Sequence, residues 1–266
     1  MPAEEPGTVA VERDGAVVTV RLSRPTHANS LTTAAKQSLL EALGAAAGDQ
    51  ATRAVVLTGS GKSFCVGQDL VEHAEAMEAA PGHAFDTVGR HYSPIVRLLA
   101  TMPKPTIAAV NGTCAGAGLG FALACDIRVA ARGARFVPAF AAVGLTADSG
   151  LSATLARAIG WSRAMGLLML GRSLTADEAF QVGLVHQVVA EEEMEAEVRD
   201  LVSRLASGPT KAYAAIKEAL WAAASTDLEG ALRREGELQH RLASTADHRE
   251  AVRAFLDKRE PTFRGE

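Results

Sequence analysis

The sequence of 266 residues contains little cysteine and no excess of basic charge. Its cysteines are Cys65, Cys114 and Cys125, an odd number without a CxxC pair. This usage argues against a disulfide framework and against a zinc site or other metal centre, and it favours a reducing, cytoplasmic compartment. The formal net charge is −4. No run of like charges forms a basic arm, so a nucleic-acid partner is not expected.

A secretory leader and a membrane span are not expected either. The N-terminal segment 1–15 is acidic and lacks the apolar core of a signal peptide. Segment 105–125 carries no charge, which raises a membrane span as an alternative, but it contains Asn111 and four glycines. We expect this segment to form a buried strand, turn and helix in a protein without membrane association.

Common nucleotide-binding and hydrolase motifs are absent. Gly61-Lys62-Ser63 has Val56 where a phosphate-binding loop needs its first glycine. The glycines near residue 118 have the wrong spacing for a dinucleotide-binding fingerprint, whose third glycine falls at Phe121. Neither a serine-centred GxSxG elbow nor an HExxH motif occurs. These absences argue against nucleotide hydrolases, Rossmann enzymes, serine hydrolases and zinc peptidases.

Apolar patterning predicts an α/β core followed by helices. A hairpin is predicted around Asp14-Gly15. Strands are predicted at 9–13, 17–22, 53–57, 106–110, 127–130, 136–137 and 184–189. Helices are predicted at 31–47, around His73, and at 85–99, 151–159, 163–170, 175–181, 194–206, 209–224, 228–242 and 248–256. The change of pattern favours a catalytic core over 1–200 and a C-terminal helical segment over 201–266.

The stretch 105–150 has the features of a ligand site. Its apolar strand enters a glycine-rich turn that begins a helix, and such a turn leaves backbone N–H groups unpaired. These groups can bind an anion, or an oxygen that becomes one. Asp148 follows in a segment poor in polar residues. A lone carboxylate near a set of amide donors is the resulting hypothesis.

Several short motifs occur together in a fixed order. They are Arg24-Pro25, Asn29-Ser-Leu31, Val55-Val-Leu-Thr-Gly59, Ser63-Phe-Cys-Val-Gly-Gln-Asp69, Lys104-Pro-Thr-Ile-Ala-Ala-Val-Asn-Gly112, Gly116-Ala-Gly118 and Ala124-Cys-Asp-Ile127. Weaker matches are Ala176-Asp-Glu-Ala179, Gly183-Leu-Val185 and the tail Phe255–Phe263. Through these motifs the chain resembles the crotonase, or enoyl-CoA hydratase/isomerase, superfamily over nearly its full length.

The resemblance implies a fold, a substrate class and an assembly. The fold is a ClpP-like spiral of ββα units with a C-terminal helical segment for trimerisation, and the assembly is a homotrimer or a dimer of trimers. The substrate is an acyl-CoA thioester of the kind met in fatty acid metabolism or phenylacetate catabolism. Because coenzyme A is part of the substrate, no separate cofactor is expected.

The resemblance also assigns site residues. The backbone amides of Gln68 and Ala117 correspond to the family's oxyanion hole, which stabilises an enolate. Glycines beside them let the thioester approach, although a tight turn or close packing is the alternative reason for such glycines. Asp69 is also expected to order its loop or cap the next helix. The implied substrate contacts are Arg24, Cys65, Val66, Gly67, Asp69, Leu70, Gly116, Gly118, Gly120, Phe140, Leu145, Lys217 and Phe263.

Two departures from the family pattern bear on the reaction. Hydratases of the superfamily use two glutamates to activate water, and the aligned positions are Gly120 and Phe140. Neither residue transfers a proton, which argues against efficient hydration. Asp148 matches the acidic position of enoyl-CoA and dienoyl-CoA isomerases of the superfamily, and the run from residues 137–140 to 144–150 looks especially like that of 1,2-epoxyphenylacetyl-CoA isomerases. The sequence therefore favours an acyl-CoA isomerase that shifts a double bond, or rearranges an epoxide, with Asp148 as general acid and base.

Three alternatives stay open from the sequence. Asp148 precedes Ser149-Gly150 and an apolar run, so it is also a good candidate for a helix N-cap. An enoyl-CoA hydratase with an atypical water-activating site is a second possibility. A non-catalytic acyl-CoA-binding protein is a third.

Overall fold

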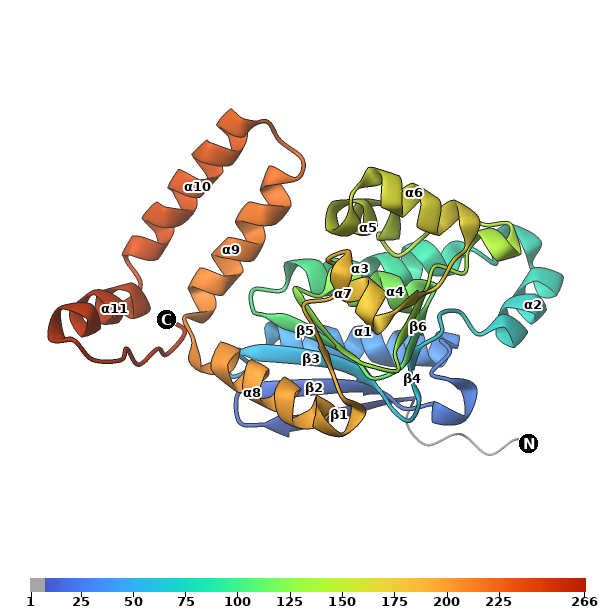
Figure 1. Cartoon of the computed structure of the whole chain (residues 1–266), viewed down its shortest axis with the longest axis horizontal. Coiled ribbons are helices and arrows are strands. Elements are labelled where there is room, and N and C mark those ends of the chain that lie inside the picture. Colours follow the sequence, from blue (N-terminus) through green and yellow to red (C-terminus); the bar gives the residue numbers. More distant parts are fainter. Residues whose placement is uncertain (1–7) are drawn as a thin grey trace.

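The larger of two sheets has six strands, ordered β1-β2-β3-β5-β7-β10, in a computed structural model that describes residues 8–266 (Figure 1). Only β1 is antiparallel to its neighbour. The central strands are apolar runs without alternation because helices cover both faces of the sheet. The six strands are β1 (Val9–Asp14), β2 (Val17–Leu22), β3 (Ala54–Gly59), β5 (Thr106–Val110), β7 (Ile127–Ala131) and β10 (Gln187–Val189).

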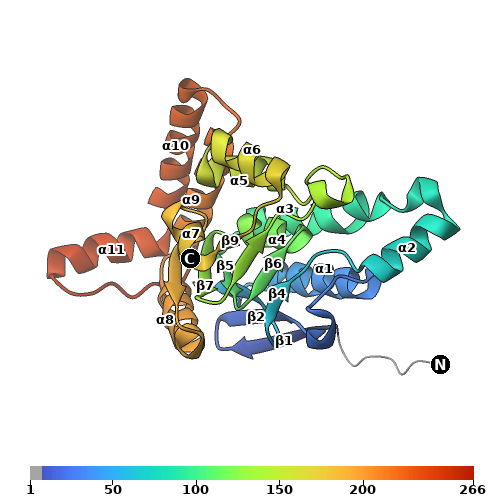
Figure 2. The same cartoon turned by 45° about the vertical axis from the view of Figure 1, so that its right-hand side comes forward.

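The smaller sheet is built from very short strands, visible beside the larger sheet in Figure 2. Its order is β4 (Ser63–Cys65), β6 (Thr113–Ala115), β8 (Arg135–Val137) and β9 (Leu174–Thr175). Strands β3, β5 and β7 are each followed by one strand of this sheet and then by a helix. The expected spiral of ββα units is therefore confirmed.

The sequence predicted no strand at residues 63–65 and 113–115, where the structure has β4 and β6. Three residues are too few to show a strand period, and their extended form depends on parallel partners elsewhere in the chain. The hairpin turn was also displaced by one residue. Asp14 pairs with Val17, so Gly15 and Ala16 form its loop.

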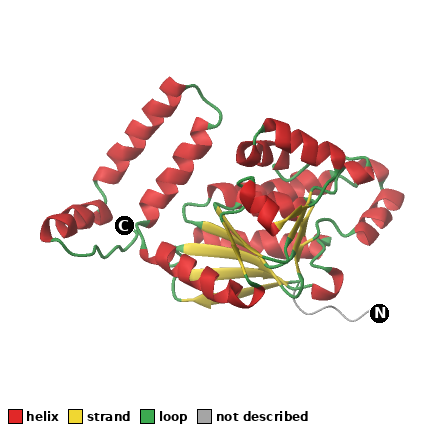
Figure 3. Ribbon diagram, in the orientation of Figure 1, coloured by secondary structure: helices red, strands yellow, loops and turns green. Residues whose placement is uncertain are grey.

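Helices cover the sheets on both sides (Figure 3). The helix α4 is buried along its whole length, since it contains only alanine, glycine, leucine and phenylalanine. On the opposite face α8 packs through Met194, Val198 and Val202 against β3, β5 and β7. The core helices are α1 (Thr33–Gly48), α2 (Leu70–Ala79), α3 (Ser93–Thr101), α4 (Ala117–Ala124), α5 (Leu151–Ile159), α6 (Trp161–Leu170), α7 (Ala176–Gln181) and α8 (Met194–Ser207).

The last three helices project from the core (Figures 1 and 2). They are α9 (Thr210–Ala223), α10 (Leu228–Ala243) and α11 (Ala246–Asp257). Helix α8 spans the expected boundary at residue 200 and packs on the sheet, so the projecting part begins with α9. Within residues 8–266, no helix combines the length and the apolar character that crossing a membrane requires.

Candidate active site

The loop after β4 presents the amide of Gln68. Gly67 has φ +87°, a conformation that favours glycine. The loop is fixed to the start of α1, because Leu31 N–H donates to Gly67 O at 2.8 Å and Asp69 N–H donates to Leu31 O at 3.2 Å. The N–H of Gln68 lies between these two bonds and donates to none of the described residues.

The turn after β6 presents the second amide. Gly116 has φ +53°, and Ala117 is the first residue of α4, where a helix leaves its N–H without an internal partner. A Cβ placed on Gly67 would lie 3.2 Å from the Ala117 nitrogen, so the two loops are in direct contact. The geometry brings together the two amides that the resemblance assigned to an oxyanion hole.

Both amides border a cavity of about 150 Å³. Its wall is mostly apolar and comes from α2, the segment before α3, and residues 139–148. Asp148 is the one carboxylate in this wall among the described residues. The lining residues are Val66, Gly67, Gln68, Leu70, His73, Phe85, Thr87, Val88, Tyr92, Gly116, Ala117, Ala139, Phe140, Val143, Leu145 and Asp148.

Asp148 is a half-buried carboxylate and not a helix cap. The N-cap position of α5 is Gly150, and no side chain caps that helix. The Asp148 carboxylate accepts a hydrogen bond from Ser149 Oγ at 2.8 Å. Burial raises the pKa of Asp148, and the Ser149 hydrogen bond opposes that rise. The capping alternative is therefore wrong. A raised pKa makes a carboxylate a stronger base once it is ionised.

Neither of the two positions that the resemblance aligns with hydratase glutamates carries an acid here. At one of them there is also no room for a side chain. A Cβ on Gly120 would lie 2.4 Å from Ser149 Cβ and 2.7 Å from Ser149 O, so the backbone before α5 occupies that space. Phe140 lines the cavity with an aromatic ring. Neither position provides a carboxylate, in line with the interpretation of the sequence.

Some expected contacts lie behind the cavity wall. A Cβ on Gly118 would lie 2.4 Å from Cys65 O, so this glycine permits α4 to pack closely on β4. Cys65 itself is fully buried, which raises the pKa of its thiol to about 12. Gly118, Gly120 and Cys65 therefore shape the site from behind, as the packing alternative proposed.

Arg24 and Asp69 order the loop that carries Gln68. Asp69 accepts hydrogen bonds from Ser30 Oγ at 2.8 Å and Arg24 Nη1 at 3.1 Å. Its carboxylate also caps α2 by accepting from the N–H of Glu72. The hydrogen bonds from Ser30 and Arg24 lower the pKa of Asp69 in spite of its burial. This outcome confirms the expectation that Asp69 orders its loop and caps the next helix.

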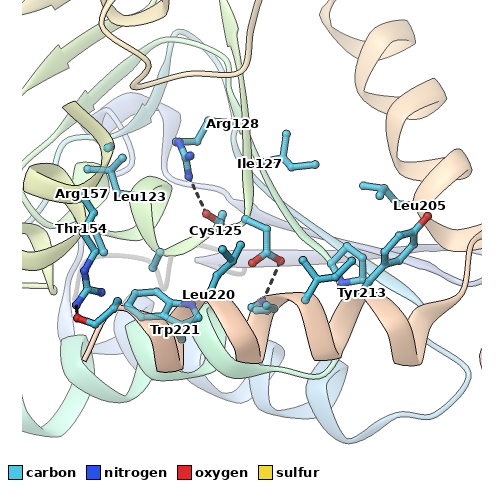
Figure 4. Close-up of a pocket in the computed structure, with 17 residues that line it drawn as sticks. Leu123, Cys125, Ile127, Arg128, Thr154, Arg157, Leu205, Tyr213, Leu220 and Trp221 are labelled. Carbon is cyan, nitrogen blue, oxygen red and sulfur yellow. Dashed lines mark hydrogen bonds and ion pairs between the residues drawn. The ribbon is translucent and has the colours of Figure 1, made fainter. Parts of the chain in front are cut away.

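Lys217 lies in a different cavity, of about 470 Å³, between α9 and the core. Figure 4 shows this cavity, where Tyr213, Leu220 and Trp221 of α9 face the segment from Leu123 to Arg128. Lys217 is only 7% exposed, and its Nζ donates to Leu99 O at 2.8 Å and to Asp126 Oδ2 at 3.0 Å. Within one chain its ammonium group therefore connects α9 to the core.

Phe263 also lies outside the small cavity, near the C-terminus. Its carbonyl accepts a hydrogen bond from Arg53 Nη1 at 3.1 Å. The structure of a single chain thus joins Asp148, Gln68, Ala117, Phe140 and Leu145 in one place and does not bring Lys217 or Phe263 to them.

The sequence reasoning missed Tyr92, His73 and Lys36. Tyr92 and His73 line the cavity from segments whose apolar patterns gave no sign of function. Lys36 stands on the same face of α1 as Leu39 and Leu43, and all three side chains are almost fully buried. The sequence did contain one signal for Lys36, because a lysine within the apolar stripe of a helix is buried only when it has a partner.

Comparisons with known proteins identify the family of the chain. The enoyl-CoA hydratase/isomerase family model matches residues 12–266. The chain therefore belongs to the enoyl-CoA hydratase/isomerase family. The solved structure of an enoyl-CoA hydratase from Bacillus anthracis superposes with a TM-score of 0.91 at 33% identity, covering 98% of this chain and 100% of the other.

Two similar relatives carry names from both branches of the family. The 1,2-epoxyphenylacetyl-CoA isomerase of Escherichia coli K12 is 42% identical over 250 residues, 94% of this chain and 95% of its own length. A Rhodobacter capsulatus protein named "Probable enoyl-CoA hydratase" is 40% identical over 259 residues, 97% of this chain and 98% of its own. Overall similarity therefore leaves the choice between isomerase and hydratase to the residues of the site.

Lys217→Met separates a structural from a substrate-binding role for this lysine. We expect a loss of about 2 kcal/mol in unfolding free energy, because Leu99 O loses its buried donor and Asp126 its cation. The affinity for an acyl-CoA should stay within about twofold of the wild-type value, because a residue that does not contact the substrate has little effect on binding. Thermal unfolding and calorimetric titration measure the two quantities. Weaker acyl-CoA binding at unchanged stability would show that Lys217 contacts substrate.

Proposed function

We propose that this protein is an acyl-CoA isomerase that moves a double bond, or rearranges an epoxide, in an enoyl-CoA-type thioester. The observation that carries the proposal is a single carboxylate, Asp148, beside two unpaired amides in an apolar cavity. Isomerisation needs one base that removes a proton and returns it elsewhere. It does not need a second group to activate water.

The site's own residues account for each step of the proposed double-bond shift. The thioester oxygen accepts hydrogen bonds from the amides of Gln68 and Ala117. Asp148 takes a proton from an acidic carbon of the acyl chain, and the electron pair moves to the thioester oxygen as an enolate. The protonated Asp148 then returns the proton to a different carbon as the electrons flow back. Each preorganised amide contributes about 3 kcal/mol of transition-state stabilisation.

The apolar wall supports this use of Asp148. Phe140, Val143 and Leu145 approach the cavity from the same segment as the carboxylate. Val143 and Leu145 are exposed in the structure, so the site excludes water only when an acyl group covers them. Exclusion of water then keeps the carboxylate basic and protects the enolate from protonation by solvent. An apolar acyl group fits such a wall.

Hydration is a second candidate, and His73 is the observation in its favour. Its imidazole lines the same cavity as Asp148 and is able to exchange protons with a water molecule. Isotope incorporation separates the reactions, because hydration adds solvent oxygen to the product and isomerisation does not. A non-catalytic acyl-CoA-binding protein is a third candidate, which would give no solvent deuterium at the acyl carbons.

The exposed apolar residues of α9–α11 support the proposed homotrimer or dimer of trimers. Leu220, Leu228, Phe255 and Leu256 are each more than two-thirds exposed in one chain. Apolar side chains on neighbouring helices indicate a protein–protein interface. We expect light scattering to give the mass of three or six chains of 27.7 kDa each. A mass of one chain at micromolar concentration would contradict this assembly.

Asp148→Asn tests the catalytic assignment. The amide occupies the same space but is not a base, so turnover should fall by about 10²–10⁴-fold, with little change in acyl-CoA affinity. Isomer formation from enoyl-CoA, dienoyl-CoA and 1,2-epoxyphenylacetyl-CoA substrates is the measurement. Asp86→Asn, at a half-buried aspartate that pairs with Arg90 and does not line the cavity, is the control and should keep full activity. Retained turnover in Asp148→Asn would refute the assignment.

The raised pKa of Asp148 also predicts how stability depends on pH. The folded state holds this proton more tightly than the unfolded state, whose pKa is near the ordinary value of 3.8. The resulting stabilisation is complete below that value and is lost as the pH rises through the raised folded pKa. Asp148→Asn should therefore be more stable than the wild type at pH 7, with a difference that shrinks toward pH 4. Denaturant unfolding across this range would show a constant difference if the carboxylate were not desolvated.

A further inference from the structure

A buried lysine contacts the side chain of the oxyanion-loop residue. Lys36 lies in the first turn of α1 and is 1% exposed. Its Nζ donates to Gln68 Oε1 at 3.0 Å. Glu72 on α2 is the nearest acidic partner, with Oε1 3.9 Å from Nζ. The ammonium group therefore makes its close contact with a residue of the site and a longer one with a carboxylate.

Tyr92 donates to the same oxygen from another direction. Its hydroxyl hydrogen-bonds to Gln68 Oε1, and the Lys36 Nζ lies 5.5 Å from the centroid of its ring. Tyr92 is 2% exposed and lines the cavity that contains Asp148. Gln68 Oε1 thus receives two donors, from α1 and from the segment before α3, and these donors hold the side chain from two sides.

A second buried lysine, Lys104, binds only backbone carbonyls among the described residues and serves as a comparison for Lys36. Lys104 is 4% exposed, and its Nζ donates to Ala46 O at 2.9 Å and Asp49 O at 2.8 Å at the end of α1. Burial lowers the pKa of both lysines. Lys104 satisfies backbone carbonyls far along α1, whereas Lys36 directs its charge at Gln68. Burying a cation is costly unless it finds partners, and the close partner of Lys36 is the side chain of Gln68.

We propose that Lys36 is a positioning residue which, together with Tyr92, holds Gln68 so that its amide N–H is aimed at the thioester oxygen, with a positive charge behind the developing enolate. The inference rests on the proposed oxyanion hole. Backbone hydrogen bonds to Leu31 hold the Gly67 carbonyl and the Asp69 N–H on either side of Gln68. The contacts of Lys36 and Tyr92 with Gln68 Oε1 add a further anchor on the residue between them, which limits how far its peptide reorients. A preorganised donor is effective because it does not reorient as charge develops.

Loss of the contact between Lys36 and Gln68 should lower kcat and leave KM nearly unchanged. The interaction strengthens as charge accumulates on the thioester oxygen, so its loss lowers kcat and kcat/KM together and changes KM little. Lys36→Met keeps a similar volume but removes the donor and the charge. We expect kcat for isomerisation to fall at least tenfold, with KM within about twofold of the wild type, as for lost transition-state contacts.

A second readout does not depend on which reaction the protein catalyses. Hexanoyl-CoA labelled with ¹³C at the carbonyl binds without any double bond to move. Infrared difference spectroscopy measures how far the oxyanion hole lowers its carbonyl stretching frequency. We expect a clear shift in the wild type and a smaller shift in Lys36→Met and in Tyr92→Phe. If the protein were a hydratase, this measurement would still test the role of Lys36.

A double-mutant cycle shows whether Lys36 acts through Gln68. Gln68→Met keeps the backbone amide and removes the side-chain oxygen that Lys36 and Tyr92 bind. If Lys36 acts through that oxygen, adding Lys36→Met to Gln68→Met causes little further loss of kcat or of carbonyl shift. Lys104→Met is the matched control. It should lower thermal stability and leave both the carbonyl shift and the kcat of the folded protein unchanged.

Two results would overturn the proposal. One is a Lys36→Met variant with reduced stability but a wild-type carbonyl shift, as expected for Lys104→Met. The other is full additivity of Lys36→Met and Gln68→Met, which would show that the lysine acts independently of Gln68. Asp148→Asn keeps this proposal distinct from the proposed function. If that variant loses isomerase activity but keeps a normal carbonyl shift, the proton transfer has failed while the oxyanion hole is intact.

Discussion

The parallel pairing of β4 with β6 is the contact on which the site depends. Cys65 lies opposite Cys114 in this pairing, and each strand leads into a glycine turn with an unpaired amide. The register brings Gly67 against the nitrogen of Ala117, although about fifty residues separate the two loops in the chain. In the proposed mechanism the backbone amides bind the thioester oxygen, so the side chains at these positions are free to serve other purposes. At Gln68 the side chain connects the loop to α1 and to Tyr92.

The electrostatic character of the cavity follows from what surrounds Asp148. Its burial in an apolar wall favours the protonated form, while Ser149 supplies a partner for the ionised form. Ser149 also occupies the space beside Gly120, where hydratases carry a glutamate. The same short segment therefore supplies one carboxylate and excludes another. This combination is suited to moving a proton between two carbons, and the cost is a site that is less stable when Asp148 is ionised.

The sequence predicted much of the fold because long elements have clear periods. It found the strands of the larger sheet and all the long helices, including α8 to α11. It did not predict β4 and β6, because strands of three residues have no readable period and their extended form depends on parallel partners distant in the chain. It identified Asp148, Gln68 and Ala117 through a resemblance, whereas their physical signals alone, a glycine turn and an isolated carboxylate, left capping and packing as alternatives.

By itself the sequence determined the order of elements, the absence of glutamates at residues 120 and 140, and the identity of the remaining carboxylate. Only the tertiary structure decided how each side chain is used. It placed Lys217 on Asp126, Asp69 on Arg24 and α2, and Lys36 on Gln68. The physical reason is that a charge buried far from water must find partners in space, and those partners come from elements that are distant along the chain.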